Sequence, residues 1–263
     1  MKIKVLMENT TALPDFRTEH GLSLYLETGT HKLLFDTGQS DGFAENAERL
    51  GVNLADVDLA VLSHGHYDHG GGLNTFLSLN KKAPVYLSQF AFEPHLKATG
   101  KDIGLDPALQ ENPRLISVDD YIRLDNGLEL FSCNEWERFY KLNPFGLTMC
   151  LDGEVLPEDF RHEQYLLITE GGTRILISGC SHKGILNLEE WFEPDVLIGG
   201  FHFMNLDPRA DGRPALDAAA AELVRHDTIY YTCHCTGTEQ YTYLKSKLKQ
   251  QLHYLSAGQE LEL

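Results

Sequence analysis

Short apolar runs alternate with stretches of helical spacing along most of the chain. In the first half, apolar runs predict strands at 2–8, 22–27, 32–35, 57–62 and 84–87. Apolar positions recurring every three or four residues predict helices at 40–50 and 73–79. Gly51 follows the first of these helices, where a C-terminal cap is expected.

The stretch from about residue 90 to 159 has a weaker pattern. It holds five of the ten prolines, and its clearest elements are antiparallel strands at 115–118, 121–124 and 128–132. The rhythm then returns, with strands predicted at 164–169, 174–178, 196–198, 228–232 and 253–255, and helices at 184–192, 214–226 and 238–250. Each half thus begins with strands and continues with helices, which favours an α/β (α+β) fold of two mixed sheets between helical layers.

The composition fits one large globular unit. The chain has 263 residues, of which 42% are hydrophobic and 10% aromatic, enough for a sizeable core. No repeat or linker divides the sequence, so we predict a single domain over 1–263. No apolar run approaches the roughly 20 residues that cross a bilayer, and the first eight residues resemble a strand more than a signal peptide. A cytoplasmic location without membrane contact is therefore expected.

The formal net charge of −17 narrows the choice of partner. So acidic a surface repels polyanions, and no cluster of lysine and arginine offsets it, so nucleic acid is not expected as a partner. A small-molecule substrate is favoured, and the oligomeric state is left open. The five cysteines are an odd number in a chain too long to need disulfides, so we expect reduced thiols.

The strongest chemical motif is Ser63-His64-Gly65-His66-Tyr67-Asp68-His69, which directly follows a predicted buried strand. Imidazole and carboxylate suit zinc, iron or manganese. Alternate side chains of an extended segment share a face, so His64 and His66 can bind one ion, and a turn can bring Asp68 and His69 to a second. The motif is too compact to complete a ligand set by itself, so further ligands must come from elsewhere.

This motif resembles the His-x-His-x-Asp-His pattern of the metallo-β-lactamase superfamily. The segments 19–23, 178–184, 199–203 and 233–237 are similar to one branch of it, labelled dihydropterin–ribofuranosylaminobenzene 5′-phosphate synthase. The resemblance extends over nearly the whole chain and implies the αββα sandwich of that superfamily.

The resemblance implies a centre of two divalent ions, zinc first, with manganese or iron as alternatives. The ligands of one ion would be His64, His66 and His182. The ligands of the other would be Asp68, His69 and His234. Asp36, in the turn after an early strand, is expected to support the metal loop without binding metal. Cys180 stands where a bridging aspartate is expected; it is either a thiolate at or near the ions or a small buried side chain.

Other residues are expected at the substrate pocket. Asp68 and His202 are the predicted catalytic side chains, and His202, His20, Lys183 and Thr236 are predicted to contact substrate. Thr236 and Glu239 have the spacing of a capping box, which would place a helix N-terminus beside His234 as a seat for an anion. The alternatives that remain are a core or loop role for His202, a solvated side chain for Lys183 and simple helix capping for Thr236.

The remaining candidates are expected outside the centre. His162 is interpreted as a solvated strand entry, and His31, His95, His226 and His253 as surface residues. Cys233 and Cys235 flank His234, and on a strand both thiols would point away from the imidazole, so they are interpreted as packing residues.

Two divalent ions lower the pKa of bound water from about 15.7 to near 7. We therefore expect a hydrolase or transferase that uses metal-bound hydroxide on a small anionic, phosphorylated substrate, in the manner of the synthase branch. A phosphodiesterase or nuclease of the same fold is an alternative, opposed by the acidic charge. A non-hydrolytic iron-binding protein or a binding-only module is a further alternative.

Overall fold

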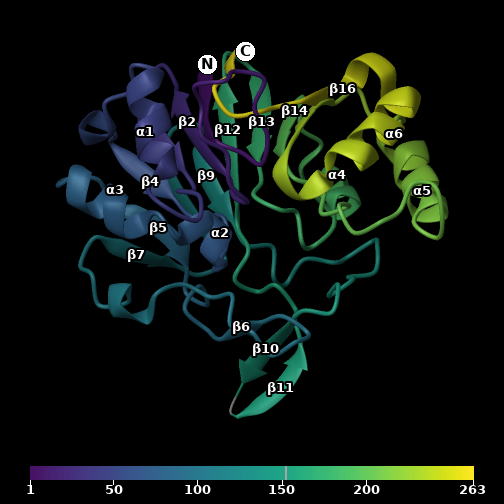
Figure 1. Cartoon of the computed structure of the whole chain (residues 1–263), viewed down its shortest axis with the longest axis horizontal. Helices are drawn as coiled ribbons and strands as arrows, with labels where there is room; N and C mark the ends of the chain where they lie inside the picture. The colour runs from purple at the N-terminus through teal and green to yellow at the C-terminus, as the bar shows by residue number, and fades with distance from the viewer. Residues whose placement is uncertain (152) are drawn as a thin grey trace.

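Two seven-stranded sheets pack face to face, and helices cover their outer faces (Figure 1). The computed structural model describes residues 1–151 and 153–263. The fold class predicted from the apolar pattern, two mixed sheets between helical layers, is confirmed. Among the described residues, no helix is long and apolar enough to cross a membrane.

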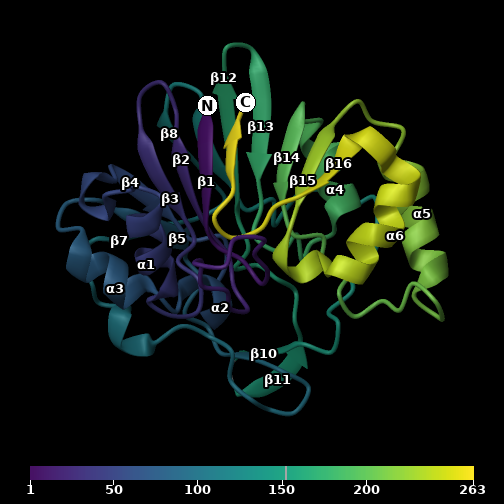
Figure 2. The same ribbon diagram turned by 45° about the horizontal axis from the view of Figure 1, so that its top comes forward.

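The first sheet is built mainly from the N-terminal half. Its strands, in spatial order, are β17 (Glu260–Glu262), β1 (Lys2–Met7), β2 (Ser23–Glu27), β3 (Lys32–Phe35), β4 (Leu59–Val61), β5 (Val85–Ser88) and β7 (Leu115–Val118). The helices α1 (Gly42–Arg49) and α3 (Leu73–Leu79) lie on its outer side in Figure 2. The short 3-10 helices η1 (Leu54–Asp56) and η2 (Pro107–Leu109) lie in its connections.

The second sheet is built from the C-terminal half. Its strands, in spatial order, are β16 (Leu252–Tyr254), β15 (Ile229–Thr232), β14 (Val196–Gly199), β13 (Thr173–Ile177), β12 (Tyr165–Glu170), β9 (Leu128–Phe131) and β8 (Tyr121–Asp125). Its outer face is covered by α4 (Ile185–Phe192), α5 (Arg213–Leu223) and α6 (Thr238–Leu248). Two further 3-10 helices are η3 (His234–Thr236) and η4 (Lys249–Gln251).

Both sheets follow the same succession of pairings. In the first, β17, β1, β2 and β3 pair antiparallel, and β3, β4, β5 and β7 pair parallel. In the second, β8, β9, β12 and β13 pair antiparallel, and β13 to β16 pair parallel. The parallel strands of each sheet end at one edge, so the loops that follow them gather there.

Three apolar clusters hold these layers together. The first lies between the two sheets and contains, for example, Phe35 and Ile177. The second packs the outer face of the first sheet against α1 and α3, with Phe43 and Phe76 at its centre. The third packs the second sheet against α4, α5 and α6 around Tyr230.

Four strands and one short helix were not predicted. A three-stranded sheet of β6 (His95–Leu96), β10 (Thr148–Leu151) and β11 (Glu154–Pro157) lies at the end of the molecule away from the chain termini in Figure 1. The strand β17 pairs with β1, and the helix α2 (Tyr67–Gly70) begins inside the histidine motif. These elements have two to four residues each, too short for a periodic pattern.

Candidate metal centre

The candidate ligands come from loops at the edge where the parallel strands end. The loop after β4 carries the histidine motif, the loop after β13 carries Cys180 and His182, and the turns after β14 and β15 carry His202 and His234. Two sheets thus contribute side chains to one place between them.

The first ligand set is His64, His66 and His182. Their ligand nitrogens lie within 4.8 Å of one another, and all three side chains are buried. The Nε2 atoms of His64 and His66 and both ring nitrogens of His182 have no hydrogen-bond partner. Burial lowers the pKa of each ring well below its usual range, which keeps a lone pair free at neutral pH. Such orphaned buried nitrogens fit metal binding.

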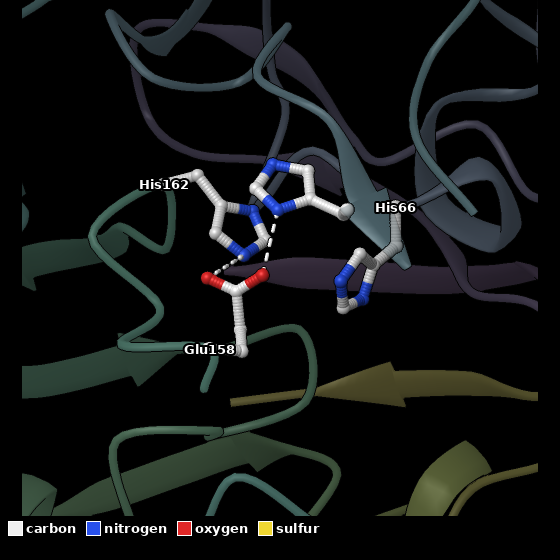
Figure 3. A group of neighbouring side chains, drawn as sticks. His66, Glu158 and His162 are labelled. Carbon is white, nitrogen blue, oxygen red and sulfur yellow. Dashed lines mark hydrogen bonds and ion pairs between the residues drawn. The ribbon is translucent and has the colours of Figure 1, made fainter. Parts of the chain in front are cut away.

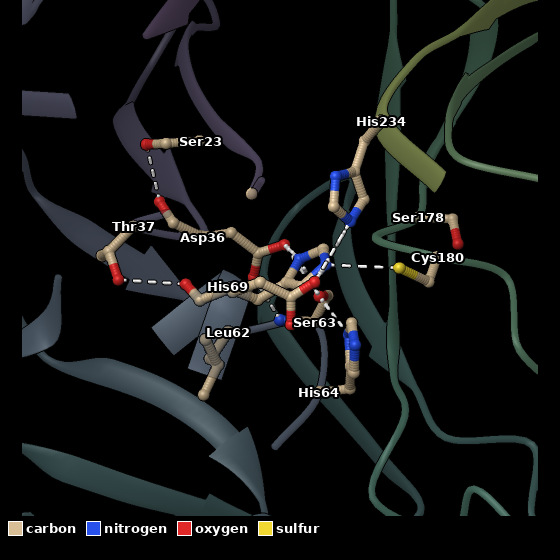
Figure 4. Close-up of polar contacts among 12 residues, drawn as sticks. Ser23, Asp36, Thr37, Leu62, Ser63, His64, His69, Ser178, Cys180 and His234 are labelled. Atoms are coloured by element: carbon tan, nitrogen blue, oxygen red, sulfur yellow. Dashed lines mark hydrogen bonds and ion pairs between the residues drawn. The ribbon is translucent and has the colours of Figure 1, made fainter. Parts of the chain in front are cut away.

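The second set is Asp68, His69 and His234, and Figure 4 labels its two histidines. The Nε2 atoms of His69 and His234 are 3.2 Å apart, and Asp68 Oδ2 lies 3.4 Å from His234 Nε2 and 3.9 Å from His69 Nε2. Burial opposes the charged form of Asp68, but hydrogen bonds from His20 and His234 outweigh it and hold the pKa of Asp68 well below its usual range. The set therefore offers one carboxylate and two imidazoles to a cation.

Asp36 contacts the metal loop, where the family resemblance places a supporting aspartate. Its Oδ1 accepts from the Ser63 amide at 2.7 Å, and its Oδ2 accepts from Ser63 Oγ at 2.7 Å and lies 2.6 Å from His69 Nδ1. Burial opposes a charge on His69, but Asp36 outweighs it and raises the pKa of His69 to about 9. The bond to Nδ1 turns Nε2 of His69 toward the site.

Ser63 also brings the two sheets close together. Its Oγ lies 2.8 Å from His64 Nδ1, and a Cβ at Gly179, on the loop of the other sheet, would lie 2.2 Å from this oxygen. Gly179 is therefore needed for the close approach of the two loops.

His234 is held by the first segment of the chain. Its Nδ1 lies 2.8 Å from Asn9 Oδ1, and its amide donates to Glu8 Oε1 at 2.6 Å. Asp36, Ser181, His202 and His234 all have φ between 49° and 60°, the left-handed region. Such strain is concentrated at functional sites, where surrounding contacts maintain it.

Two thiols face the ligand sets. Cys180 Sγ lies 3.3 Å from His69 Nε2, and ligand-atom groups join Cys180 to both sets. The prediction that Cys235 is only a packing residue was wrong, because Cys235 lines the pocket and forms a ligand-atom group with Cys180 and His234. Residues 234–236 form η3 and not a strand, so side-chain alternation does not apply. Cys233 does pack in the core between the sheets.

The ligand sets open into a pocket of about 230 Å³. His20 and His202 line it as predicted; His20 Nε2 lies 3.2 Å from Asp68 Oδ2, and the His202 ring centroid lies 4.3 Å from that of His182. Lys97 also lines the pocket and supplies a cationic side chain that was not predicted. It belongs to the stretch after residue 90, where the sequence pattern is weak.

Lys183 does not reach the pocket, contrary to the prediction. Its side chain is fully buried, and Nζ donates to the carbonyl oxygens of Ser132 at 2.5 Å and Glu163 at 2.9 Å. Burial lowers the pKa of Lys183 to about 8 even though Glu163 opposes this shift. Lys183 stabilises the loop behind His182.

Thr236 is not a helix cap, so the predicted capping box with Glu239 was wrong. The helix α6 begins after Gly237 and has no side-chain cap. Thr236 Oγ1 instead accepts from the Phe201 amide at 2.8 Å, inside the core. Thr236 therefore joins the loops of His202 and His234 and is not among the residues that line the pocket.

A second buried group lies behind His66 (Figure 3). It contains His95, Glu158 and His162, so the expectation that these histidines are solvated was wrong: both are fully buried. Glu158 Oε2 lies 2.8 Å from His95 Nδ1, and Glu158 Oε1 lies 3.7 Å from His162 Nε2. Glu158 lies near the end of residues 90–159, where the apolar pattern is weak, and its role was not predicted from the sequence. By contrast, His31, His226 and His253 are partly exposed.

The ligand atoms of this group lie within 4.8 Å of one another and of His66. However, His162 Nδ1 accepts from the Gly65 amide at 2.8 Å. A neutral imidazole that accepts at Nδ1 carries its proton on Nε2, which is then a donor and not a metal ligand. The group is therefore a hydrogen-bonded support for the metal loop.

A family model described as the metallo-beta-lactamase superfamily matches residues 17–211. The chain belongs to this superfamily. Two relatives from Methanocaldococcus jannaschii are each 29% identical and each match 92% of this chain. One is an uncharacterised protein covered over 93% of its length; the other, covered over 90%, is named 7,8-dihydropterin-6-methyl-4-(beta-D-ribofuranosyl)-aminobenzene-5′-phosphate synthase. The resemblance to that branch is confirmed.

Among solved metallo-β-lactamase structures, Tm1679 aligns with 100% of this chain at a TM-score of 0.80 and 27% identity, over 99% of its own length. It is described as a metal-dependent hydrolase of the beta-lactamase superfamily. The superfamily fold generally holds divalent metal ions. Both ligand sets fit such ions in donor type, and the first set also fits them in its lack of other partners.

Proposed function

We propose that this protein is a metal-dependent hydrolase or transferase that acts on a small anionic, phosphorylated substrate. The observation that carries the proposal is the pair of ligand sets, His64/His66/His182 and Asp68/His69/His234, each of which contributes two side chains to the lining of one pocket. The relative named as a synthase and the hydrolase-type structural neighbour support the same class of chemistry.

Zinc, or alternatively manganese or iron, bound by these sets would activate water near neutral pH and polarise a carbonyl or phosphoryl oxygen. The chain's own residues supply the surroundings. Asp68 lies between His20 and His234 and stays ionised. Its carboxylate can therefore accept a hydrogen bond from a group bound in the pocket. His20 donates its Nε2 proton to Asp68, and Asn9 Nδ2 lies 3.4 Å from its Nδ1.

His202 and Lys97 approach the pocket from opposite halves of the chain. His202 touches the His182 ring and lines the pocket, so it can donate to an oxygen of bound substrate or of the leaving group. Lys97 places an ammonium group at the pocket wall of a chain with net charge −17. A cationic site in an acidic surface favours a small anion over a polyanion.

The test begins with metal analysis of protein purified without added metal. We expect roughly two divalent ions per chain, as a two-metal site requires, and hydrolysis within a panel of phosphomonoesters, phosphodiesters and lactones. Asp68→Asn and His234→Ala should reduce both the metal content and the activity. His31→Ala, a change at a partly exposed histidine bonded to Asp125, is the matched control.

Three outcomes separate the alternatives. Two zinc or manganese ions with panel activity support the proposal. Iron with a reversible redox signal and no hydrolysis would favour the iron-binding alternative, to which the thiols of Cys180 and Cys235 are suited as soft ligands. A metal content that Asp68→Asn and His234→Ala leave unchanged would show that the ligand assignment is wrong.

A further inference from the structure

A second cavity borders the metal pocket and is walled by apolar side chains. Its volume is about 320 Å³, and its walls come from residues 140–145, the start of α4, residues 201–206 and α5. Phe145 and His182 line both this cavity and the metal pocket. The two spaces are therefore neighbours that share one imidazole and one phenyl ring in their walls.

The floor of this apolar cavity is buried and its walls are half-buried. Ile185, Phe201 and Ala219 form the floor. The half-buried walls include Leu142, Leu186, Phe203 and Leu206. These large side chains leave apolar surface facing an open concave space, which is how ligand pockets are usually lined.

One charged and one neutral polar side chain line the cavity where it is exposed. Lys141 and Asn143 line it and are exposed, whereas Ala215 and Ala218 present only methyl groups along one side of α5. The small alanines keep the space open where longer side chains of a helix would fill it. The cavity therefore suits an alkyl or aryl group and not a second charged group.

We propose that this cavity holds the apolar part of the substrate, so that the substrate is an amphiphile whose anionic group lies at the metal pocket. The proposal rests on the proposed function, because it assigns the anionic end to that site. Phe145 and His182 mark the junction between the two parts of such a molecule. Each methylene buried in the cavity should improve binding by roughly fourfold.

The test compares substrates with one anionic group and different apolar groups. We expect kcat/KM for methyl, butyl and hexyl esters of the same phosphate, whose leaving alcohols are of similar basicity, to rise by at least about tenfold from methyl to hexyl. Ala218→Trp, at an exposed position on the cavity wall, should abolish most of this gain. Ala221→Trp, at an exposed position of α5 that does not line the cavity, is the matched control.

A binding measurement keeps this test separate from the proposed function. Calorimetry of the metal-loaded protein with methyl, hexyl and phenyl phosphonates needs no turnover. If no ester is hydrolysed but the hexyl or phenyl phosphonate binds more tightly than the methyl one and Ala218→Trp removes the difference, the cavity assignment stands and the proposed reaction fails. Equal affinities for the phosphonates, or equal behaviour of Ala218→Trp and Ala221→Trp, would overturn the assignment.

Discussion

Some side chains at the centre orient a candidate metal ligand, and others present a candidate ligand atom themselves. Asp36 is buried beneath the histidine motif and accepts from Ser63 twice, while its second oxygen also contacts His69. Cys180, Cys235 and Asp68 instead present their acceptor atoms to the pocket. Changes at these two kinds of residue should therefore affect metal binding through different routes.

Asp36→Asn should weaken metal binding without removing a ligand. The amide keeps the shape but loses one acceptor and the charge that orients His69, and changes of this kind cost about 10- to 100-fold in metal affinity. Competitive titration with a chelator measures the effect. Asp125→Asn, at a surface aspartate, serves as control, and an affinity unchanged by Asp36→Asn would show that Asp36 does not orient His69.

Lys97→Met should impair substrate binding more than the chemical step. Lys97 lines the pocket but belongs to neither ligand set, so its charge acts on the bound anion. We expect KM for an anionic substrate to rise by about three- to tenfold with kcat little changed, as for loss of uniform binding. Lys101→Met, a change four residues along the same loop, is the comparison; a fall in kcat with constant KM would assign Lys97 to the reaction itself.

Elements outside the two main sheets contribute to the centre through Glu158. This residue follows β11, contacts His95 in β6 and accepts from the Phe160 amide at 3.1 Å. The small sheet is thereby joined to the segment that carries His162, which contacts the metal loop at Gly65.

Glu158→Ala should destabilise the protein and not only reduce activity. It leaves buried donors of His95 and Phe160 without partners, each at a cost of about 1–3 kcal/mol. Denaturant unfolding should show a lower free energy of unfolding than the wild type. Glu154→Ala, an exposed position on β11, should lie within about 0.5 kcal/mol of the wild type. Equal stability of the two variants would contradict a structural role of Glu158.

The sequence predicts the elements that have a clear period and misses those that do not. The main strands and the helices α1, α3, α4, α5 and α6 lie close to their predicted places because their apolar faces pack in the three clusters. The strands β6, β10, β11 and β17 are short and depend on pairing partners far along the chain. Their positions are set by tertiary contacts that no local pattern records.

The candidate site could likewise be predicted only where its residues lie close together in the sequence. The compact motif at 63–69 predicts its own role, because ligand types and spacing lie within one segment. Glu158, His162, Lys97 and Cys235 have no such spacing, and their place depends on how distant loops meet. Lys183 and Thr236 are adjacent to predicted ligands, yet their side chains turn into the core.

At the scale of the whole molecule, buried histidines make stability depend on pH. Burial lowers the pKa of His64, His66, His162 and His182 below that of the unfolded chain. A histidine whose pKa is lower in the folded state has no effect on stability well above pH 6.5 and destabilises the fold as the pH falls below it, because the unfolded chain then binds the proton more readily. His69, raised to about 9, contributes fully below pH 6.5 and loses its contribution as the pH rises through 9.

The metal-free protein should therefore be most stable near pH 6.5, because the contribution of His69 is lost as the pH rises from there toward 9. Below pH 6.5 the free energy of unfolding should fall by up to about 1.4 kcal/mol per pH unit for each histidine with a lowered pKa. Urea unfolding at pH 8, 7, 6 and 5 measures this slope. Metal-loaded protein is the comparison, since bound ions compete with the same protons. Constant stability between pH 7 and 5 would show that these rings are not neutral in the fold.

The division of each ligand set between the two halves of the chain has a consequence for folding. Each ligand set draws on both halves of the chain: His182 joins His64 and His66, and His234 joins Asp68 and His69. Neither half can complete a set by itself, and the contacts that join them span more than 100 residues. Contacts so distant form late and slowly. Capture of metal should thus mark the docking of the two halves, and its rate should report the last step of folding.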